Sequence, residues 1–354
     1  MSVDDARRVI DRARAAGVFP AATMEAGSSA SPIWSDACGT DLQTLFDLAS
    51  LTKVVATTTL VMELVRTGAL RLEEPVSAFF GEWRGADREA VTVRDLLEHA
   101  SGLPARLVDA PPVGRREFEH DICATRLEYA PRTQSIYSDL GFILLGFLAA
   151  DRGGASLAEL VARITVRLQP GLLTFEFPAD VRRLAAPTRP MDEDSRRGRV
   201  LTGEVHDHYA AALGGVAGHA GLFGTAASVG AFARAVLRAA RDTDREAREE
   251  EREAFSRAYA EPFVPALVRE FTAKSTVPGS SRALGWDTML PTSSCGTRLS
   301  PRAFGHVGYT GTSLWIDPVR DRYFVLLTNR VYGGGTLDDM RTVRRAFHDA
   351  LGDL

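Results

Sequence analysis

Lysine is almost absent from this sequence of 354 residues. Lysine and arginine together number 42, but lysine occurs only at positions 53 and 274, so nearly every cation is an arginine. An arginine side chain stays protonated in proteins, whereas a desolvated lysine amine can lose its proton and accept one from a hydroxyl group. Chemistry that needs a lysine as a base therefore has two candidate positions, Lys53 and Lys274.

Cysteine is also scarce. Cys38, Cys123 and Cys295 are widely separated and show no Cys-x-x-Cys spacing. Three cysteines in this pattern indicate neither a disulfide framework nor a zinc site. We expect all three to be reduced thiols.

Long apolar runs and patches of one charge are missing as well. The longest apolar stretch, residues 142–150, is too short to cross a bilayer, and residues 2–10 lack the apolar region of a signal peptide. The formal net charge is -4 with both signs mixed throughout, which argues against a nucleic-acid or membrane-surface role. With 45% apolar and 25% charged residues, the chain is expected to be a cytoplasmic globular protein.

The stretch with the clearest chemistry is Ser50-x-x-Lys53. Residues 54–65 are apolar at helical spacing, so we expect a helix that begins near Ser50 and continues past Lys53. Positions i and i+3 share one helix face, which brings the Ser50 hydroxyl within reach of the Lys53 amine. The helix macrodipole also disfavours an extra proton on that amine. The pair is either a nucleophile with its base or a helix cap followed by a surface lysine.

The rest of the chain alternates helical and strand-like patterns. We expect helices over residues 4–16, 92–104, 139–150 and 337–352, and strands over residues 20–25, 32–35, 284–287, 313–316 and 323–328. Residues 179–208 have the composition of a long loop, and the charged run 241–253 is typical of a solvated helix face.

These patterns predict a mixed α/β (α+β) fold. One antiparallel sheet is built from both chain ends and flanked by the terminal helices, with a mostly helical insertion between them. The expected domains are residues 1–68 with 280–354 for the sheet and residues 69–279 for the helices. The cleft between the two is the expected position of a site.

Two further stretches carry polar groups toward that cleft. Tyr137-Ser138-Asp139 lies in a turn just before an apolar helix, where it can aim a phenol and a carboxylate inward. Residues 305–313 open a strand, and their glycines let a substrate approach the backbone closely.

Together, the three stretches resemble the motifs of the serine β-lactamase and penicillin-binding-protein superfamily. Within it, the chain is most similar to class C β-lactamases, family VIII esterases and D-aminopeptidases. The superfamily has Ser-x-x-Lys, then Tyr-x-Asn, then Lys-Thr-Gly or His-x-Gly on a strand. The corresponding positions here are Ser50 and Lys53, Tyr137 and Asp139, and His306 and Gly308. Residues 203–207 and 218–223 also look like esterase-like members, so the resemblance covers almost the whole chain.

This resemblance implies acyl transfer from a small ester, amide or peptide, with no cofactor and no metal. Ser50 attacks a carbonyl, and both Lys53 and Tyr137 take part in the proton transfers. The backbone N–H groups of Ser50 and Tyr309 form the oxyanion hole. Asp139, His306 and Gly308 are the implied substrate-binding residues. Water then hydrolyses the acyl-enzyme, with Tyr137 as the base.

Two positions depart from the superfamily pattern. Asp139 replaces the usual asparagine, so it cannot donate an amide hydrogen bond, and as an anion it favours a protonated Lys53. His306 replaces the lysine of the third motif, which weakens the fixed positive charge there. Both changes favour an esterase, amidase or peptidase over a β-lactamase.

Other functions stay open at this point. A zinc hydrolase built on His206, His208 and His219 is a weaker hypothesis, because these residues lack a helical His-Glu-x-x-His pattern. The glycines at 305, 308 and 311 lack the spacing and context of a dinucleotide-binding fingerprint. A catalytically inactive ligand-binding or sensor protein and a transacylase are further alternatives. The sequence leaves the natural substrate and the oligomeric state open.

Overall fold

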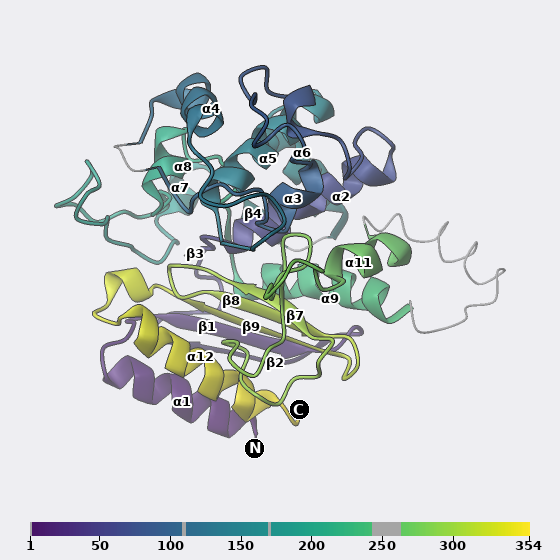
Figure 1. Cartoon of the computed structure of the whole chain (residues 1–354). Helices are drawn as coiled ribbons and strands as arrows, with labels where there is room; N and C mark the ends of the chain where they lie inside the picture. Colours follow the sequence, from purple (N-terminus) through teal and green to yellow (C-terminus); the bar gives the residue numbers. More distant parts are fainter. Residues whose placement is uncertain (1, 108–110, 169–170, 243–262) are drawn as a thin grey trace.

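The structure is a computed structural model that describes residues 2–107, 111–168, 171–242 and 263–354. Its main element is a six-stranded antiparallel sheet in the order β2-β1-β9-β8-β7-β6 (Figure 1). The strands are β1 Ala22–Gly27, β2 Pro32–Cys38, β6 Asp287–Thr288, β7 Phe304–Val307, β8 Ser313–Asp317 and β9 Arg322–Thr328. Strands β1 and β9 pair from Ala22 opposite Thr328 to Gly27 opposite Tyr323, so the two chain ends meet in the middle of the sheet. The predicted fold class is confirmed.

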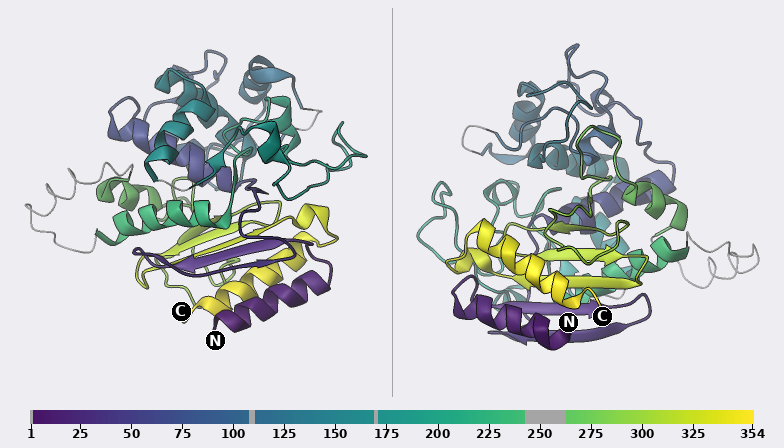
Figure 2. Two further views of the ribbon diagram at one scale, coloured as in Figure 1. Left: turned by 180° about the vertical axis from the view of Figure 1, so that it is seen from behind. Right: turned by 60° about the horizontal axis from the view of Figure 1, so that its bottom comes forward.

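Helices cover both faces of this sheet. Helices α1 (Val3–Ala15) and α12 (Leu337–Leu351) lie side by side on one face, and α9 (Ala226–Asp242) lies on the other (Figure 2). Helix α11 (Pro265–Thr272) packs against α9 and α2. Every residue of β1 and of β8 is buried, as expected for strands covered on both sides. The terminal helices begin with capping boxes, which fixes where each one starts on the sheet.

The helical part of the chain surrounds one apolar helix, α5 (Asp139–Gly153). Residues 140–149 of α5 are all buried, so this helix forms the centre of the helical part and holds its N-terminus at the cleft. Five helices pack against α5: η1 (Lys53–Thr58), α2 (Thr59–Arg66), α3 (Val93–Leu97), α4 (Gly114–Ala124) and α6 (Leu157–Thr165). The shorter helices of this part are η2 (Val76–Ala78), η3 (Val166–Leu168), α7 (Ala179–Arg182) and α8 (His208–Ala212). Among the described residues, no single helix is long and apolar enough to span a membrane, although α5 and the segment Leu157–Leu168, bent by 77°, pass that test as a pair.

A small second sheet connects the two parts. It consists of β3 (Phe46–Asp47), β5 (Phe223–Gly224) and β4 (Leu173–Thr174), with β5 in the middle. Strand β3 leads directly into the Ser50 turn, so this sheet ties the start of the site to the segment after residue 220.

Three local predictions need correction. The helix expected over residues 92–104 is shorter, because α3 ends at Leu97 and His99 has a left-handed φ of 55°. Residues 284–286 are not a strand: Gly285 has a left-handed φ of 82°, and its amide donates to the Leu97 carbonyl at 2.9 Å, which draws the chain toward α3 until β6 begins at Asp287. The helix after Ser50 starts as a π-helix, η1, which apolar spacing does not distinguish from an α-helix. From residue 243 on, the charged run 241–253 lies outside the described residues.

Candidate active site

A sharp bend places Ser50 at the mouth of the helical part. Ala49 has a left-handed φ of 47°, an unusual conformation for a residue with a side chain. Buried Asp47 stabilises the bend, because its carboxylate accepts hydrogen bonds from the amides of Ala49 at 2.8 Å and His206 at 2.6 Å. Burial raises the pKa of Asp47 to about 6. The chain turns at Ser50 and continues into η1 at Lys53.

The Ser50 hydroxyl receives two hydrogen bonds. The Lys53 amine donates to Oγ at 3.2 Å, and the Tyr137 hydroxyl donates to the same atom at 2.7 Å. The Lys53 Nζ atom also lies 4.8 Å from the centre of the Tyr137 ring. Residues 87 positions apart in the sequence therefore converge on one oxygen atom, in the arrangement that the three motifs predict.

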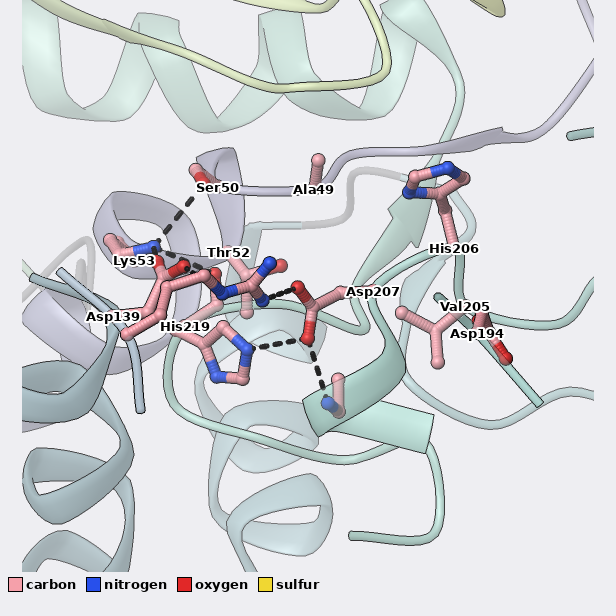
Figure 3. A network of polar contacts seen from close by, with 12 residues as sticks. Ala49, Ser50, Thr52, Lys53, Asp139, Asp194, Val205, His206, Asp207 and His219 are labelled. Atoms are coloured by element: carbon pink, nitrogen blue, oxygen red, sulfur yellow. Dashed lines mark hydrogen bonds and ion pairs between the residues drawn. The ribbon is translucent and has the colours of Figure 1, made fainter. Parts of the chain in front are cut away.

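Lys53 is a fully buried cation. Its amine donates to Ser50 Oγ, to Oδ1 of Asp139 at 2.7 Å and to the His219 carbonyl at 3.2 Å, so each of its three protons has an acceptor (Figure 3). Burial lowers the pKa of Lys53, but the charge of Asp139 and its hydrogen bond to the amine outweigh burial, and the pKa is raised above its usual value. The resting amine is therefore an ammonium, contrary to the expectation from the helix macrodipole alone.

Tyr137 is a neutral phenol in the resting site. Burial raises its pKa, and although Lys53 works in the opposite direction, the pKa stays above that of a free phenol. The ring lies between His99 and His306, whose ring centres are 4.8 Å and 6.0 Å away. His99 is buried and its Nδ1 accepts from the Ser138 amide at 3.0 Å, so this histidine has a structural role.

The third motif approaches Ser50 through its backbone. His306 is buried, its Nδ1 bonds to the Val307 carbonyl at 2.9 Å, and burial followed by the charges of Arg282 and Lys53 holds its pKa far below the usual value. His306 is therefore neutral and carries no fixed charge toward a substrate.

Gly308 permits a close approach between the third motif and the bend before Ser50. A Cβ atom at Gly308 would lie 2.1 Å from Thr312 Oγ1 and 2.7 Å from the Leu48 carbonyl, so only glycine fits. The Thr310 and Thr312 hydroxyls donate to the carbonyls of Asp47 and Leu48 at 2.8 Å and 3.0 Å. These bonds hold the third-motif turn against the segment that carries Ser50.

The two predicted oxyanion-hole amides are free to act. Within the described part of the chain, neither the Ser50 nor the Tyr309 backbone N–H donates a hydrogen bond. Both residues line one cavity of about 310 Å³, which Tyr137, Asp139 and His306 also line. Lys53 lies directly behind Ser50 and does not line the cavity.

The cavity also contains residues that the motifs do not single out. Arg106, Asp207 and His219 lie next to Asp139, and Arg282 and Arg344 lie on the sheet side. In the sequence, Asp207 and His219 are indicated only by the stretches 203–207 and 218–223, which resemble esterase-like members. No motif indicated the three arginines.

The histidines of the zinc hypothesis have separate partners. His219 pairs with Asp207, whereas the His206 ring stacks on Tyr309 at 5.6 Å. Across the described ranges, no group of three or more histidine, cysteine, aspartate or glutamate residues is arranged to hold a metal ion.

Fold and site together define a serine hydrolase, since a hydroxyl flanked by a lysine amine and a tyrosine hydroxyl opens into a cavity between a sheet and a helical part. Comparison with known proteins adds the family. The family model for Beta-lactamase matches residues 6–348, and the chain belongs to this family.

Curated relatives cover most of the chain. A protein of Escherichia coli K12, named provisionally as a D-alanyl-D-alanine carboxypeptidase, is 30% identical over an alignment of 319 positions that covers 81% of this chain and 69% of the relative. An N-acetylmuramyl-L-alanine amidase of Bacillus subtilis is 29% identical over 315 residues, with 81% and 68% covered.

Solved structures share the fold at lower sequence identity. A class C β-lactamase of Rhodobacter sphaeroides superposes with a TM-score of 0.74 at 18% identity, covering 99% of both chains. EstCE1, a hydrolase with promiscuous acyltransferase activity, superposes with a TM-score of 0.76 at 16% identity, covering 99% of this chain and 98% of its own.

Proposed function

We propose that this serine hydrolase transfers the acyl group of a small ester, amide or peptide first to Ser50 and then to water. The observation that carries the proposal is the pair of hydrogen bonds to Ser50 Oγ, from Tyr137 at 2.7 Å and Lys53 at 3.2 Å. A hydroxyl beside two proton-exchanging groups, open to a cavity, fits nucleophilic catalysis. Relatives named as a carboxypeptidase and an amidase support an amide or peptide substrate.

Acylation forms a bond between Ser50 Oγ and the substrate carbonyl carbon. In the reactive form, the Lys53–Tyr137 pair has lost one proton, and we assign the phenolate to Tyr137 because Lys53 is held as an ammonium by Asp139. Tyr137 takes the Ser50 proton and passes it to the leaving group as the bond from that group to the carbonyl carbon breaks. The Ser50 and Tyr309 amides stabilise the oxyanion, each by about 3 kcal/mol.

Deacylation uses the same groups with water in place of the leaving group. Tyr137 removes a proton from water, the resulting hydroxide bonds to the acyl carbon, and the bond from that carbon to Ser50 Oγ breaks. Ser50 then recovers its proton from Tyr137. Lys53 stays protonated throughout, and its charge stabilises the phenolate.

The side chains of the second and third motifs favour esters, amides or peptides over β-lactams, although Arg282 and Arg344 also line the cavity. His306 is neutral near pH 7, and Asp139 is an anion committed to Lys53, so neither supplies the positive charge that a β-lactam carboxylate requires. The cytoplasmic location and the independence from nucleic acids and membranes stay predictions from the sequence.

A substrate panel tests this proposal, with Ser50→Ala as the matched control. We expect the wild-type protein, and not the variant, to hydrolyse p-nitrophenyl esters or D-amino-acid anilides faster than nitrocefin. No turnover of any substrate, together with no labelling by a fluorophosphonate probe, would favour a ligand-binding protein. Transfer of the acyl group to an added alcohol in preference to water would identify a transacylase.

A further inference from the structure

Asp139 is approached from two sides by cations. Its Oδ1 accepts from the Lys53 amine at 2.7 Å, and its Oδ2 lies 3.5 Å from Nε of Arg106. That Nε atom is buried and, considering only described residues, has no hydrogen-bond partner. Arg106 therefore presents a positive charge and an unused donor to the carboxylate that holds Lys53.

Asp207 anchors Arg106 on the other side. Nη2 of Arg106 donates to Oδ2 of Asp207, and the guanidinium carbon lies 4.5 Å from the centre of the Tyr209 ring. Oδ1 of Asp207 accepts from Nε2 of His219 at 2.7 Å and from the Ala210 amide at 2.8 Å (Figure 3). Burial opposes a charge on Asp207, but His219 and Arg106 hold its pKa well below the usual value. Arg106 is thus fixed between two carboxylates.

The charges alternate along this network. Lys53, Asp139, Arg106 and Asp207 follow one another as cation, anion, cation and anion, and the His219 carbonyl accepts from Lys53 at 3.2 Å to close the ring. A carboxylate that faced Lys53 alone would hold the ammonium more strongly than one whose charge is shared with a second cation. The contact from Arg106 to Asp139 is longer than the one from Lys53 because Asp207 holds the guanidinium back.

We propose that Arg106, anchored by Asp207, is a positioning residue that shares the charge of Asp139 and so limits how tightly Asp139 holds the Lys53 ammonium. This inference rests on the proposed function, in which the Lys53–Tyr137 pair manages the proton of Ser50. Arg106 acts through Asp139 and has no contact with Ser50.

Asp207→Asn also removes the carboxylate partner of the His219 ring, whereas the other groups around the Lys53 amine are unchanged in both variants. They are the hydroxyls of Ser50 and Tyr137, the His219 carbonyl, and the rings of His99 and His306, whose pKa values are lowered by burial, Arg282 and Lys53. A change in Lys53 titration that appears in both Arg106→Gln and Asp207→Asn, with opposite signs, can therefore be assigned to the Arg106–Asp207 pair.

The scarcity of lysine makes this titration directly measurable. Protein labelled with ¹³C only at lysine has two side chains to observe, and Lys274 serves as an internal reference. We expect Asp207→Asn to release Arg106 toward Asp139 and to lower the Lys53 titration midpoint by about one pH unit. Arg106→Gln is expected to raise it. Asp151→Asn, which removes the partner of Arg115 outside the cavity, is the matched control and should leave it unchanged.

A double-mutant cycle separates positioning from a direct electric field. In an Asp139→Asn background, the Asp207→Asn shift should shrink to less than about a third of its original size, because the carboxylate that transmits it is gone. An equal shift in both backgrounds, or no shift in the single variant, overturns the inference. If Asp207→Asn fails to fold, Arg106→Gln provides the same test. The titration needs no substrate, so hydrolysis without a shift refutes only this inference, and a shift without hydrolysis refutes only the proposed function.

Discussion

The two walls of the Ser50 cavity differ in what they present to the nucleophile. One wall presents side chains, and the other presents mainly backbone. On the helical wall, Tyr137 donates to its hydroxyl, and Lys53 donates to the same hydroxyl from behind Ser50, outside the cavity lining. On the sheet wall, the turn after β7 contributes Tyr309 to the cavity lining, while the His306 side chain bonds to its own strand. The helical wall can therefore move protons at Ser50, and the sheet wall can hold a carbonyl oxygen in place.

The side chains of the sheet wall mainly support its backbone. Arg344 is buried, and its Nη2 donates to the carbonyls of Gly308 and Thr312 at 2.7 Å and 2.9 Å. Burial and the charge of Arg330 lower the pKa of Arg344 to about 9. Substitutions on the helical wall should therefore change the chemistry itself, whereas the sheet wall should tolerate a change at His306 as long as the turn keeps its shape.

The largest expected effect follows removal of the nucleophile. Ser50→Ala should lower kcat/KM by about a thousandfold or more, because no acyl-enzyme can form. The thermal midpoint should change little, since the side chain is small and partly exposed. Steady-state hydrolysis of an activated ester, with a melting curve on the same sample, provides both values. A variant as active as the wild type would mean that the reaction does not take place at Ser50 on the helical wall.

Substitution of Lys53 is expected to be nearly as severe. Lys53→Ala leaves the Asp139 carboxylate without its close partner. Lys53→Arg places a planar guanidinium at a position where three acceptors surround an ammonium. Each should lower kcat by about a hundredfold or more. The comparison of kcat between the two variants is the informative measurement. If the arginine variant kept most of the wild-type kcat, the charge alone would suffice and the geometry of the amine would be irrelevant.

Tyr137→Phe tests the pH dependence of the helical wall. Lys53 and Tyr137 both have raised pKa values, so the reactive form with one proton removed becomes more populated as the pH rises. We expect wild-type kcat/KM to increase toward alkaline pH, with an apparent pKa above 7 that belongs to the pair. The phenylalanine variant should lose about a hundredfold in kcat and the alkaline rise. A wild-type optimum on the acid side, or the same profile in both proteins, would remove Tyr137 from the mechanism.

The smallest effect is expected on the sheet wall. His306→Ala should lower kcat/KM by about tenfold or less, because the neutral imidazole makes no contact with Ser50. His306→Lys should improve turnover of nitrocefin by adding a permanent positive charge. Kinetics on nitrocefin and on one neutral ester separate the two effects. No gain with lysine would show that this position does not face a substrate carboxylate.

Short sequence distances explain why the core of the site was predictable. Ser50 and Lys53 are three residues apart, so helical geometry alone brings them together, and alternating apolar residues at both chain ends predict the sheet. Tyr137, Asp139 and His306 needed the order of the superfamily motifs, because the chain between them carries no spacing rule.

The Arg106–Asp207 pair could not be derived in this way. Its two residues come from different loops, and their contact with Asp139 exists only after the helical part has packed around α5. Two opposing expectations applied to the charge of Lys53, since the macrodipole disfavours a proton on its amine and Asp139 favours one. The carboxylate, 2.7 Å away in the structure, outweighs the helix terminus.

The most direct test of the account is the site of covalent modification. The wild-type protein is treated with a slowly hydrolysed ester or a phosphonate, digested, and analysed by mass spectrometry, with Ser50→Ala treated in parallel. We predict one acyl or phosphonyl adduct on the peptide that contains Ser50, and no adduct in the variant. An adduct on a different serine, or equal labelling of the Ser50→Ala protein, would contradict the central claim that Ser50 is the nucleophile.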